Sequence, residues 1–173
     1  MRLFDSDKVA CYCNTVAHQL ENRRGTDVKV VVLGLKVTPL SAELASRMAD
    51  GIKPTLFAMT DATAKVTRLR GAQFQIADLK RQKMTVYATP ETVKPSIVFD
   101  QALIGGISAK VAKDRTDFDL SFSVTFGPVG PAELEFIQSW LLSHRFVTFD
   151  AAEPLLEMGD DAGSSDNGAS DDD

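Results

Sequence analysis

The sequence is poor in the residues that most often carry catalysis or hold metals. Its 173 residues include two histidines and two cysteines. Cys11 and Cys13 lie too close together to suggest a disulfide framework, and with His18 and His144 they match no closed zinc spacing. Both histidines are expected in helices beside polar residues, where a structural role is more common than a catalytic one. We therefore expect no enzyme, no metal site and no cofactor.

Long hydrophobic runs are also missing. No apolar stretch reaches the roughly 18 residues that a membrane-spanning helix needs, and the chain does not open with the apolar core of a secretory signal. The lack of a disulfide framework favours a reducing compartment. These absences predict a soluble, cytoplasmic protein that does not contact membranes.

Basic residues are absent from the end of the chain. Residues 150–173 hold nine of the 24 acidic residues and none of the 19 lysines and arginines, which leaves about −9 in this segment and about +4 in the rest. Beyond Met158 the composition cannot bury enough apolar surface to order itself. We expect a globular β-rich domain at 1–149 and a disordered acidic tail at 150–173. The tail aspartates beyond Met158 are Asp160, Asp161, Asp166, Asp171, Asp172 and Asp173.

The first part of the globular domain has mixed periodicity. Residues 5–25 show helical spacing, although their β-branched residues leave a strand running into a loop as an alternative. Residues 27–37 (DVKVVVLGLKV) predict a strand with a bulge near Gly34. In residues 39–51, Ser41 is suited to cap a short helix, with Leu44 and Met48 as its buried stripe.

From residue 65 to 126 the period changes to two. Five short segments alternate apolar and polar residues, which is typical of an antiparallel meander. IGGIS, at residues 104–108, lacks a phosphate-binding pattern and predicts a hairpin turn. A helix is expected after Pro131, followed by a last strand over 146–149. The predicted fold class is α+β, with six to eight antiparallel strands in a curled sheet or barrel covered by two to three helices.

The segment from Lys65 to Tyr87 has a strong positive charge. It holds six cations against the single acid Asp78, and we expect it to form a hairpin. Cations neutralise phosphates and aromatic rings stack on bases, so this pattern favours single-stranded nucleic acid. Alternatively, Phe74 points into the core and the cations only protect an edge strand from aggregation. The candidate nucleic-acid-binding residues are Lys65, Arg68, Arg70, Phe74, Lys80, Arg81, Lys83 and Tyr87.

A small β-rich body with a basic, aromatic strand pair and an acidic tail resembles bacterial and phage single-stranded-DNA-binding proteins. This resemblance implies an OB-like barrel and a non-enzymatic role in replication or recombination, in the host cytoplasm if the protein is phage-encoded. DNA is then the expected ligand rather than RNA. The tail would modulate binding or recruit replication and recombination proteins, and the protein could form a homo-oligomer. The pattern departs from the bacterial one, since an apolar tip does not follow the aspartates.

The acidic tail also supports a second interpretation. A phage interaction protein could use such a tail to imitate nucleic acid and so occupy a basic host defence or transcription protein. In that case the tail, rather than the body, is the binding element.

Overall fold

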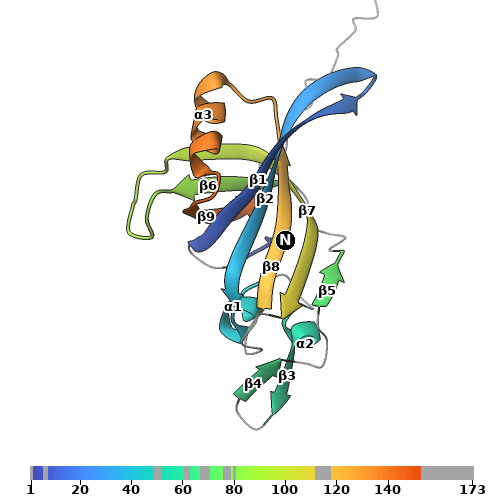
Figure 1. The fold of residues 1–173 in the computed structure, drawn as a ribbon, viewed down its shortest axis with the longest axis vertical. Helices are drawn as coiled ribbons and strands as arrows, with labels where there is room; N and C mark the ends of the chain where they lie inside the picture. The colour runs from blue at the N-terminus through green and yellow to red at the C-terminus, as the bar shows by residue number, and fades with distance from the viewer. Residues whose placement is uncertain are drawn as a thin grey trace, which may run out of the picture.

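The structure, a computed structural model, describes residues 2–5, 8–48, 52–60, 63–66, 71–75, 79, 81–111 and 118–152. Its main feature is an antiparallel sheet in the order β5-β7-β6-β9-β1-β2-β8, and β7 also pairs with β8 (Figure 1). Six strands, all but β5, therefore close into a barrel, which confirms the predicted curled antiparallel sheet. The seven strands of the sheet are β1 (Val9–Arg23), β2 (Thr26–Leu40), β5 (Gly71–Phe74), β6 (Gln82–Tyr87), β7 (Ile97–Val111), β8 (Phe118–Phe126) and β9 (His144–Ala151). A separate hairpin contains β3 (Phe57–Thr60) and β4 (Thr63–Val66).

β1 replaces the helix expected near the N-terminus. It pairs with β9 through Val9–Tyr12 and with β2 through Tyr12–Arg23. Val9, Cys11 and Cys13 are buried and the residues between them are not, so burial follows the period of a strand. The helix prediction is wrong because ladder pairing and burial outweigh the weak helical spacing. The strand alternative is correct, and both His18 and His144 lie in strands.

A bulge separates the two parts of β1. The register of β1 against β2 shifts between Cys13 and Thr15, opposite Gly34, so the extra residue is in β1 and not in β2. A side chain at Gly34 would collide with Thr15 Oγ1 and Asn14 Oδ1, which explains the glycine. The strand predicted over 27–37 is confirmed, and the irregularity predicted near Gly34 lies on its neighbour.

β7 is one long strand where two short strands and a turn were expected. Residues 104–108 lie in its middle and pair with β8 through a register shift between Gly105 and Ser108. Gly106 has φ +59°, which an L side chain rarely adopts. The glycines therefore form a bulge that bends β7 around the barrel, and the predicted hairpin turn is wrong.

The predicted Lys65–Tyr87 hairpin is also absent from the described residues. β5 pairs with β7 at Ile107–Lys110, whereas β6 pairs with β9 and with the first part of β7. Both strands thus lie beside β7, at different points along its length. The hairpin prediction failed because sequence period gives the strands but not their partners.

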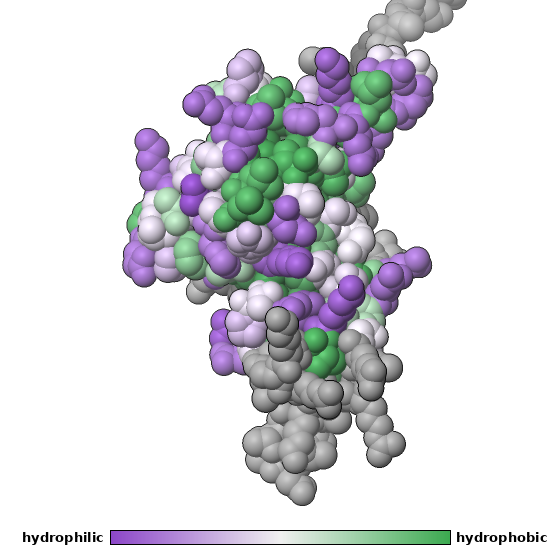
Figure 2. Space-filling model, in the orientation of Figure 1, coloured by the Kyte–Doolittle hydropathy of each residue, from purple (hydrophilic) through white to green (hydrophobic). Residues whose placement is uncertain are grey.

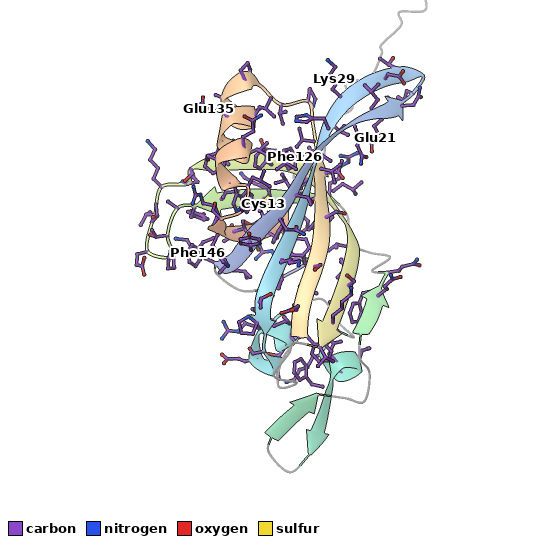
Figure 3. The ribbon with its side chains drawn as sticks, in the orientation of Figure 1. Cys13, Glu21, Lys29, Phe126, Glu135 and Phe146 are labelled. Carbon is purple, nitrogen blue, oxygen red and sulfur yellow. The ribbon has the colours of Figure 1, made fainter. Side chains whose placement is uncertain are left out.

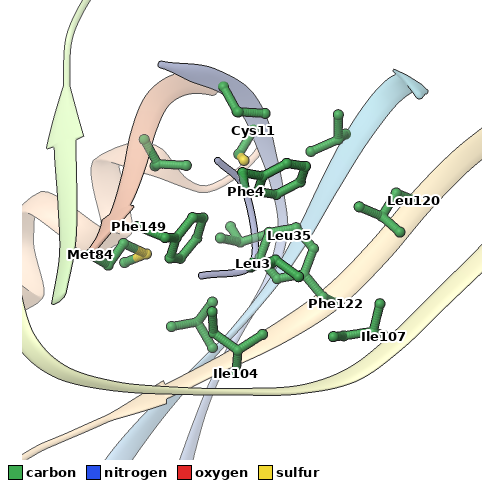
Figure 4. Close-up of a cluster of buried hydrophobic side chains, with 14 of the residues drawn as sticks. Leu3, Phe4, Cys11, Leu35, Met84, Ile104, Ile107, Leu120, Phe122 and Phe149 are labelled. Carbon is green, nitrogen blue, oxygen red and sulfur yellow. The ribbon is translucent and has the colours of Figure 1, made fainter. Parts of the chain in front are cut away.

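Every strand of the barrel contributes buried side chains to the core, which fills the barrel interior (Figure 4). β8 alternates strictly, with Phe118, Leu120, Phe122, Val124 and Phe126 buried, as the sequence predicts. Leu3 and Phe4, which precede β1, enter the same core and are almost fully buried. The ring of Phe4 lies 6.1 Å from that of Phe149 and 6.3 Å from that of Phe122. The N-terminal segment is therefore part of the barrel's core.

Three helices accompany the described part of the sheet. α1 (Ala42–Ser46) begins at the predicted cap, where the Leu44 amide donates to Ser41 Oγ at 3.2 Å. It ends before Met48, which is buried outside the helix and bridges to Phe4. α2 (Ile52–Leu56) is equally short, and α3 (Pro131–Trp140) is the helix expected after Pro131. The Trp140 indole is fully buried and donates to Cys11 O, so α3 is fixed against β1. Among the described residues no helix has the length and apolarity to cross a membrane.

Candidate nucleic-acid interface

Half of the predicted binding residues lie wholly or partly outside the described residues. Arg68, Arg70 and Lys80 lie outside the described residues, and only the backbone of Lys65 is described, in β4. β4 belongs to the small β3–β4 hairpin and not to the barrel. The roles predicted for these four cations therefore stay predictions.

Three of the remaining candidates have contacts within the protein. Phe74, in β5, is half-buried and packs against the core. Arg81 Nη1 donates to Gln101 O at 3.3 Å, and Lys83 Nζ lies 3.8 Å from an Asp100 carboxylate oxygen. Both cations are partly accessible. The Lys83–Asp100 ion pair is therefore a surface pair, and such pairs contribute little stability. Phe74 suits a core role better than a stacking role.

Tyr87 has a different environment. It ends β6 with its ring half-buried, and Lys8 Nζ lies 4.2 Å from the ring centroid. The same ammonium donates to Pro90 O at 2.8 Å and to Thr92 O at 2.5 Å. Lys8 thereby links the segment before β1 to the loop after β6, and it covers one face of Tyr87. A cation over an aromatic face is attracted to it, so the pair is held together.

Two further aromatic rings lie on the outside of the barrel near Tyr87. Phe146 of β9 is directly opposite Tyr87 in the ladder, and its other neighbour is the exposed Ala10 of β1. Tyr12 lies two residues further along β1, between the buried Cys11 and Cys13. Because strand neighbours alternate between faces, Tyr12, Phe146 and Tyr87 all point outward. Figure 3 shows Phe146 far from the end of the β1–β2 hairpin, where Glu21 and Lys29 are labelled.

A row of polar residues continues from Tyr12 across the sheet. His144 of β9 pairs with Tyr12, Tyr12 pairs with Lys36 of β2, and Lys36 pairs with Ser121 of β8. The rings of Tyr12 and His144 are 5.1 Å apart, and the Lys36 side chain is exposed. We call this surface the outer aromatic face and define it by Lys8, Tyr12, Lys36, Tyr87, His144 and Phe146.

The sequence interpretation found only Tyr87 among these six residues. The sequence predicts Tyr12 and His144 in helices, and it predicts Phe146 in a closing strand. The sequence CYC alternates as a strand does, with a tyrosine between two cysteines. This period of two is the signal that could have indicated that Tyr12 faces outward. Bringing β1, β6 and β9 together depends on strand order, which no local pattern contains.

The two thiols, and two acids that line a cavity, are in structural environments. Cys11 and Cys13 are buried, and burial raises the pKa of the Cys13 thiol to about 11 and that of Cys11 further. A cavity of about 210 Å³ between β7 and the start of α3 is lined in part by Asp100 and Glu133. Asp100 pairs with Lys83, and Glu133 accepts the Gly130 amide at 2.5 Å. No group of three or more histidines, cysteines and acids suited to a metal occurs in the described part of the chain.

Comparison with known proteins gives no relative. No protein family, curated protein or solved structure matches the chain. Any functional conclusion therefore depends on the residues and on their arrangement.

Proposed function

We propose that this protein is a non-enzymatic binder of single-stranded nucleic acid, with DNA as the preferred ligand, and that the outer aromatic face is its binding surface. The observation that carries the proposal is the outward position of three rings, Tyr12, Tyr87 and Phe146, on neighbouring strands of one barrel. Lys8 and Lys36 lie on the same face. The role in replication or recombination, and a phage origin, follow only from the resemblance to single-stranded-DNA-binding proteins.

The chemistry of this face fits a flexible single strand. Every base has a π-face, so a stacked ring contributes about 1–3 kcal/mol per base without reading sequence. Lysines neutralise phosphates, and serine hydroxyls such as that of Ser121 can donate to phosphate oxygens. Since Lys8 covers one face of Tyr87, a base would stack on the opposite face, while Tyr12 and Phe146 supply the other two rings.

The barrel supports this proposal at the level of fold. OB folds are small barrels that bind oligonucleotides on a strand face, and we infer that this closed antiparallel barrel is OB-like. Residues 150–173 hold nine acidic residues and no lysine or arginine. They would compete with the nucleic acid for the cations of the body or recruit partner proteins.

The salt dependence of binding tests the role of the lysines. Affinity for a single-stranded oligonucleotide of about 12 nucleotides should fall steeply with salt, and Lys36→Ala should reduce the slope of log K against log salt by about 0.7. Lys110→Ala is the matched control, because Lys110 is an exposed lysine of β7 directly opposite Asp119. If the two variants had equal slopes of log K against log salt, Lys36 would not belong to the binding site. Absence of binding by the intact and tailless proteins at low salt would refute the proposal.

A further inference from the structure

The β1–β2 hairpin continues well beyond the barrel. The pairing of β1 with β9 ends at Tyr12, and the pairing of β2 with β8 begins only at Val31. Residues 19–30, which we call the arm, form the part of the two strands that pairs with no other strand of the described residues, and they extend away from the barrel (Figure 1). Such an extension exposes two strand edges.

The tip of the arm is well defined. Its two-residue loop has positive φ at Arg24 (51°) and Gly25 (82°), as a type I′ turn requires. Asn22 Nδ2 donates to Asp27 Oδ1 at 3.0 Å, and the Gly25 amide donates to Asn22 Oδ1 at 3.1 Å. The hairpin is therefore pre-organised, and little conformational entropy would be lost if one of its edges bound a partner.

The outer edge of β1 has partners only as far as the bulge. There the Cys13 amide donates to Ser143 O at 3.1 Å, and the Leu142 amide donates to Cys13 O at 2.8 Å. Beyond the bulge, the type I′ turn makes Arg23 and Thr26 a hydrogen-bonded pair. Hydrogen-bonded and non-hydrogen-bonded pairs alternate along the ladder, so the N–H groups of Val16, His18 and Leu20 point away from β2. Within the described residues no strand pairs with this edge.

The two edges of the arm differ in protection. Free edges are usually protected by charged residues or proline. The edge of β2 carries Asp27 and Lys29, whereas the edge of β1 has its charged residues, Glu21 and Arg23, near the tip and has no lysine, arginine, acid or proline from Thr15 to Leu20. Leu20 is 68% exposed on this edge, and Leu142 is 68% exposed near its base. Figure 2 shows hydrophobic side chains gathered where α3 approaches β1. The β1 edge is thus the one suited to pairing.

We propose that the β1 edge pairs antiparallel with the β1 edge of a second copy of this chain, about a two-fold axis at His18. In that register Val16 of each copy faces Leu20 of the other, and their outward N–H and C=O groups are matched. Glu21 then faces Thr15, so no carboxylate opposes another. This self-complementarity identifies a second copy as the occupant. The inference does not depend on nucleic-acid binding.

Sedimentation velocity of the full chain without nucleic acid tests this interface. The wild-type protein should sediment as a dimer. His18→Pro should give a monomer, because it removes an N–H that points away from β2 and leaves the hairpin pairing intact. Lys29→Pro, which makes the equivalent change on the β2 edge, should remain a dimer.

A second variant guards against misfolding. Leu20→Lys leaves the backbone unchanged and adds a charge to the edge, so it should also sediment as a monomer with an unaltered circular dichroism spectrum. A monomeric wild-type protein at the highest soluble concentration would overturn the proposal. So would a dimer that persists in both His18→Pro and Leu20→Lys. A monomeric wild type whose oligonucleotide affinity falls in Leu20→Lys would overturn it in favour of a nucleic-acid contact on the arm.

Discussion

At the scale of single residues, the aromatic side chains divide between the core and the outer aromatic face. Phe74 lies between Arg70 and Lys80 in the basic segment, yet its ring packs against the buried cluster. Tyr12 lies between two buried cysteines, yet its own side chain points outward. A residue's role is therefore set by which face of its strand it occupies, and sequence neighbours do not reveal it.

Phe74→Ala is expected to affect stability rather than binding. Truncating a half-buried ring removes packing and leaves a partial cavity, at a cost of about 1–3 kcal/mol, less than the 3–5 typical of a fully buried ring. Urea denaturation should show the loss, while oligonucleotide affinity at a fixed salt concentration stays unchanged. Weaker binding at full stability would assign Phe74 to the binding surface.

The two buried thiols predict a loss of stability at high pH. Burial raises the pKa of Cys13 from its ordinary 9.0 to about 11, and Cys11 shifts further in the same direction. This contribution is fully present below pH 9.0 and is lost as pH rises toward the folded-state pKa, by up to ~1.4 kcal/mol per pH unit for each cysteine. Urea denaturation between about pH 8 and pH 10.5 should show the decline. Cys13→Ala should decline less steeply, and an equal slope would contradict this origin.

At the scale of elements, most strands could be predicted but their connections could not. Alternation in FDLSFSVTF defines β8 correctly, and Ser41 and Pro131 mark the starts of two helices. The glycines of IGGIS predict a turn, but they form a bulge, because both structures can place a glycine at positive φ and so have the same local signal. Helical spacing obscures β1 in the sequence: β2 follows it after a two-residue turn, but its other partner, β9, is distant in the sequence and no local pattern indicates that pairing.

Two alanine variants test directly whether residues 105 and 106 form a bulge in β7. Gly106 has φ +59°, whereas Gly105 has an ordinary φ, and both would place a new Cβ near Ser123 Oγ without severe overlap. Gly106→Ala should therefore destabilise the protein by about 1–2 kcal/mol more than Gly105→Ala, because of the left-handed backbone. Chemical denaturation of the two variants measures the difference. Equal stabilities would mean that residue 106 is not held in this conformation.

At the scale of the whole molecule, charge separates the body from the acidic end of the chain. The body carries about +4 and residues 150–173 about −9. Of the predicted site, Tyr87 joins the outer aromatic face, Phe74 packs against the core, and Arg81 and Lys83 contact groups of β7. The sequence could indicate a basic, aromatic sheet surface. It could not indicate which strands bring the rings together, because that depends on barrel closure.

Removing the acidic segment should strengthen binding. Deletion of residues 159–173 takes away six aspartates that compete electrostatically with phosphate, so the oligonucleotide Kd should fall, most strongly at low salt. Replacing the same aspartates by asparagine keeps the length and tests charge alone. An unchanged Kd in both variants would show that the segment does not compete. If the deletion abolished binding to a basic host protein and the remaining body did not bind DNA, the result would favour the nucleic-acid mimic.

The most direct test of the central claim is the affinity of a double variant, Tyr12→Ala with Phe146→Ala, for a single-stranded oligonucleotide of about 12 nucleotides. If the outer aromatic face is the binding surface, each lost ring should weaken binding roughly five- to hundredfold, with the salt slope nearly unchanged because a stacked ring releases no counterion. Tyr12→Phe with Phe146→Tyr, which keeps both rings, should bind like the wild type. A correctly folded double alanine variant that binds with wild-type affinity would contradict the account.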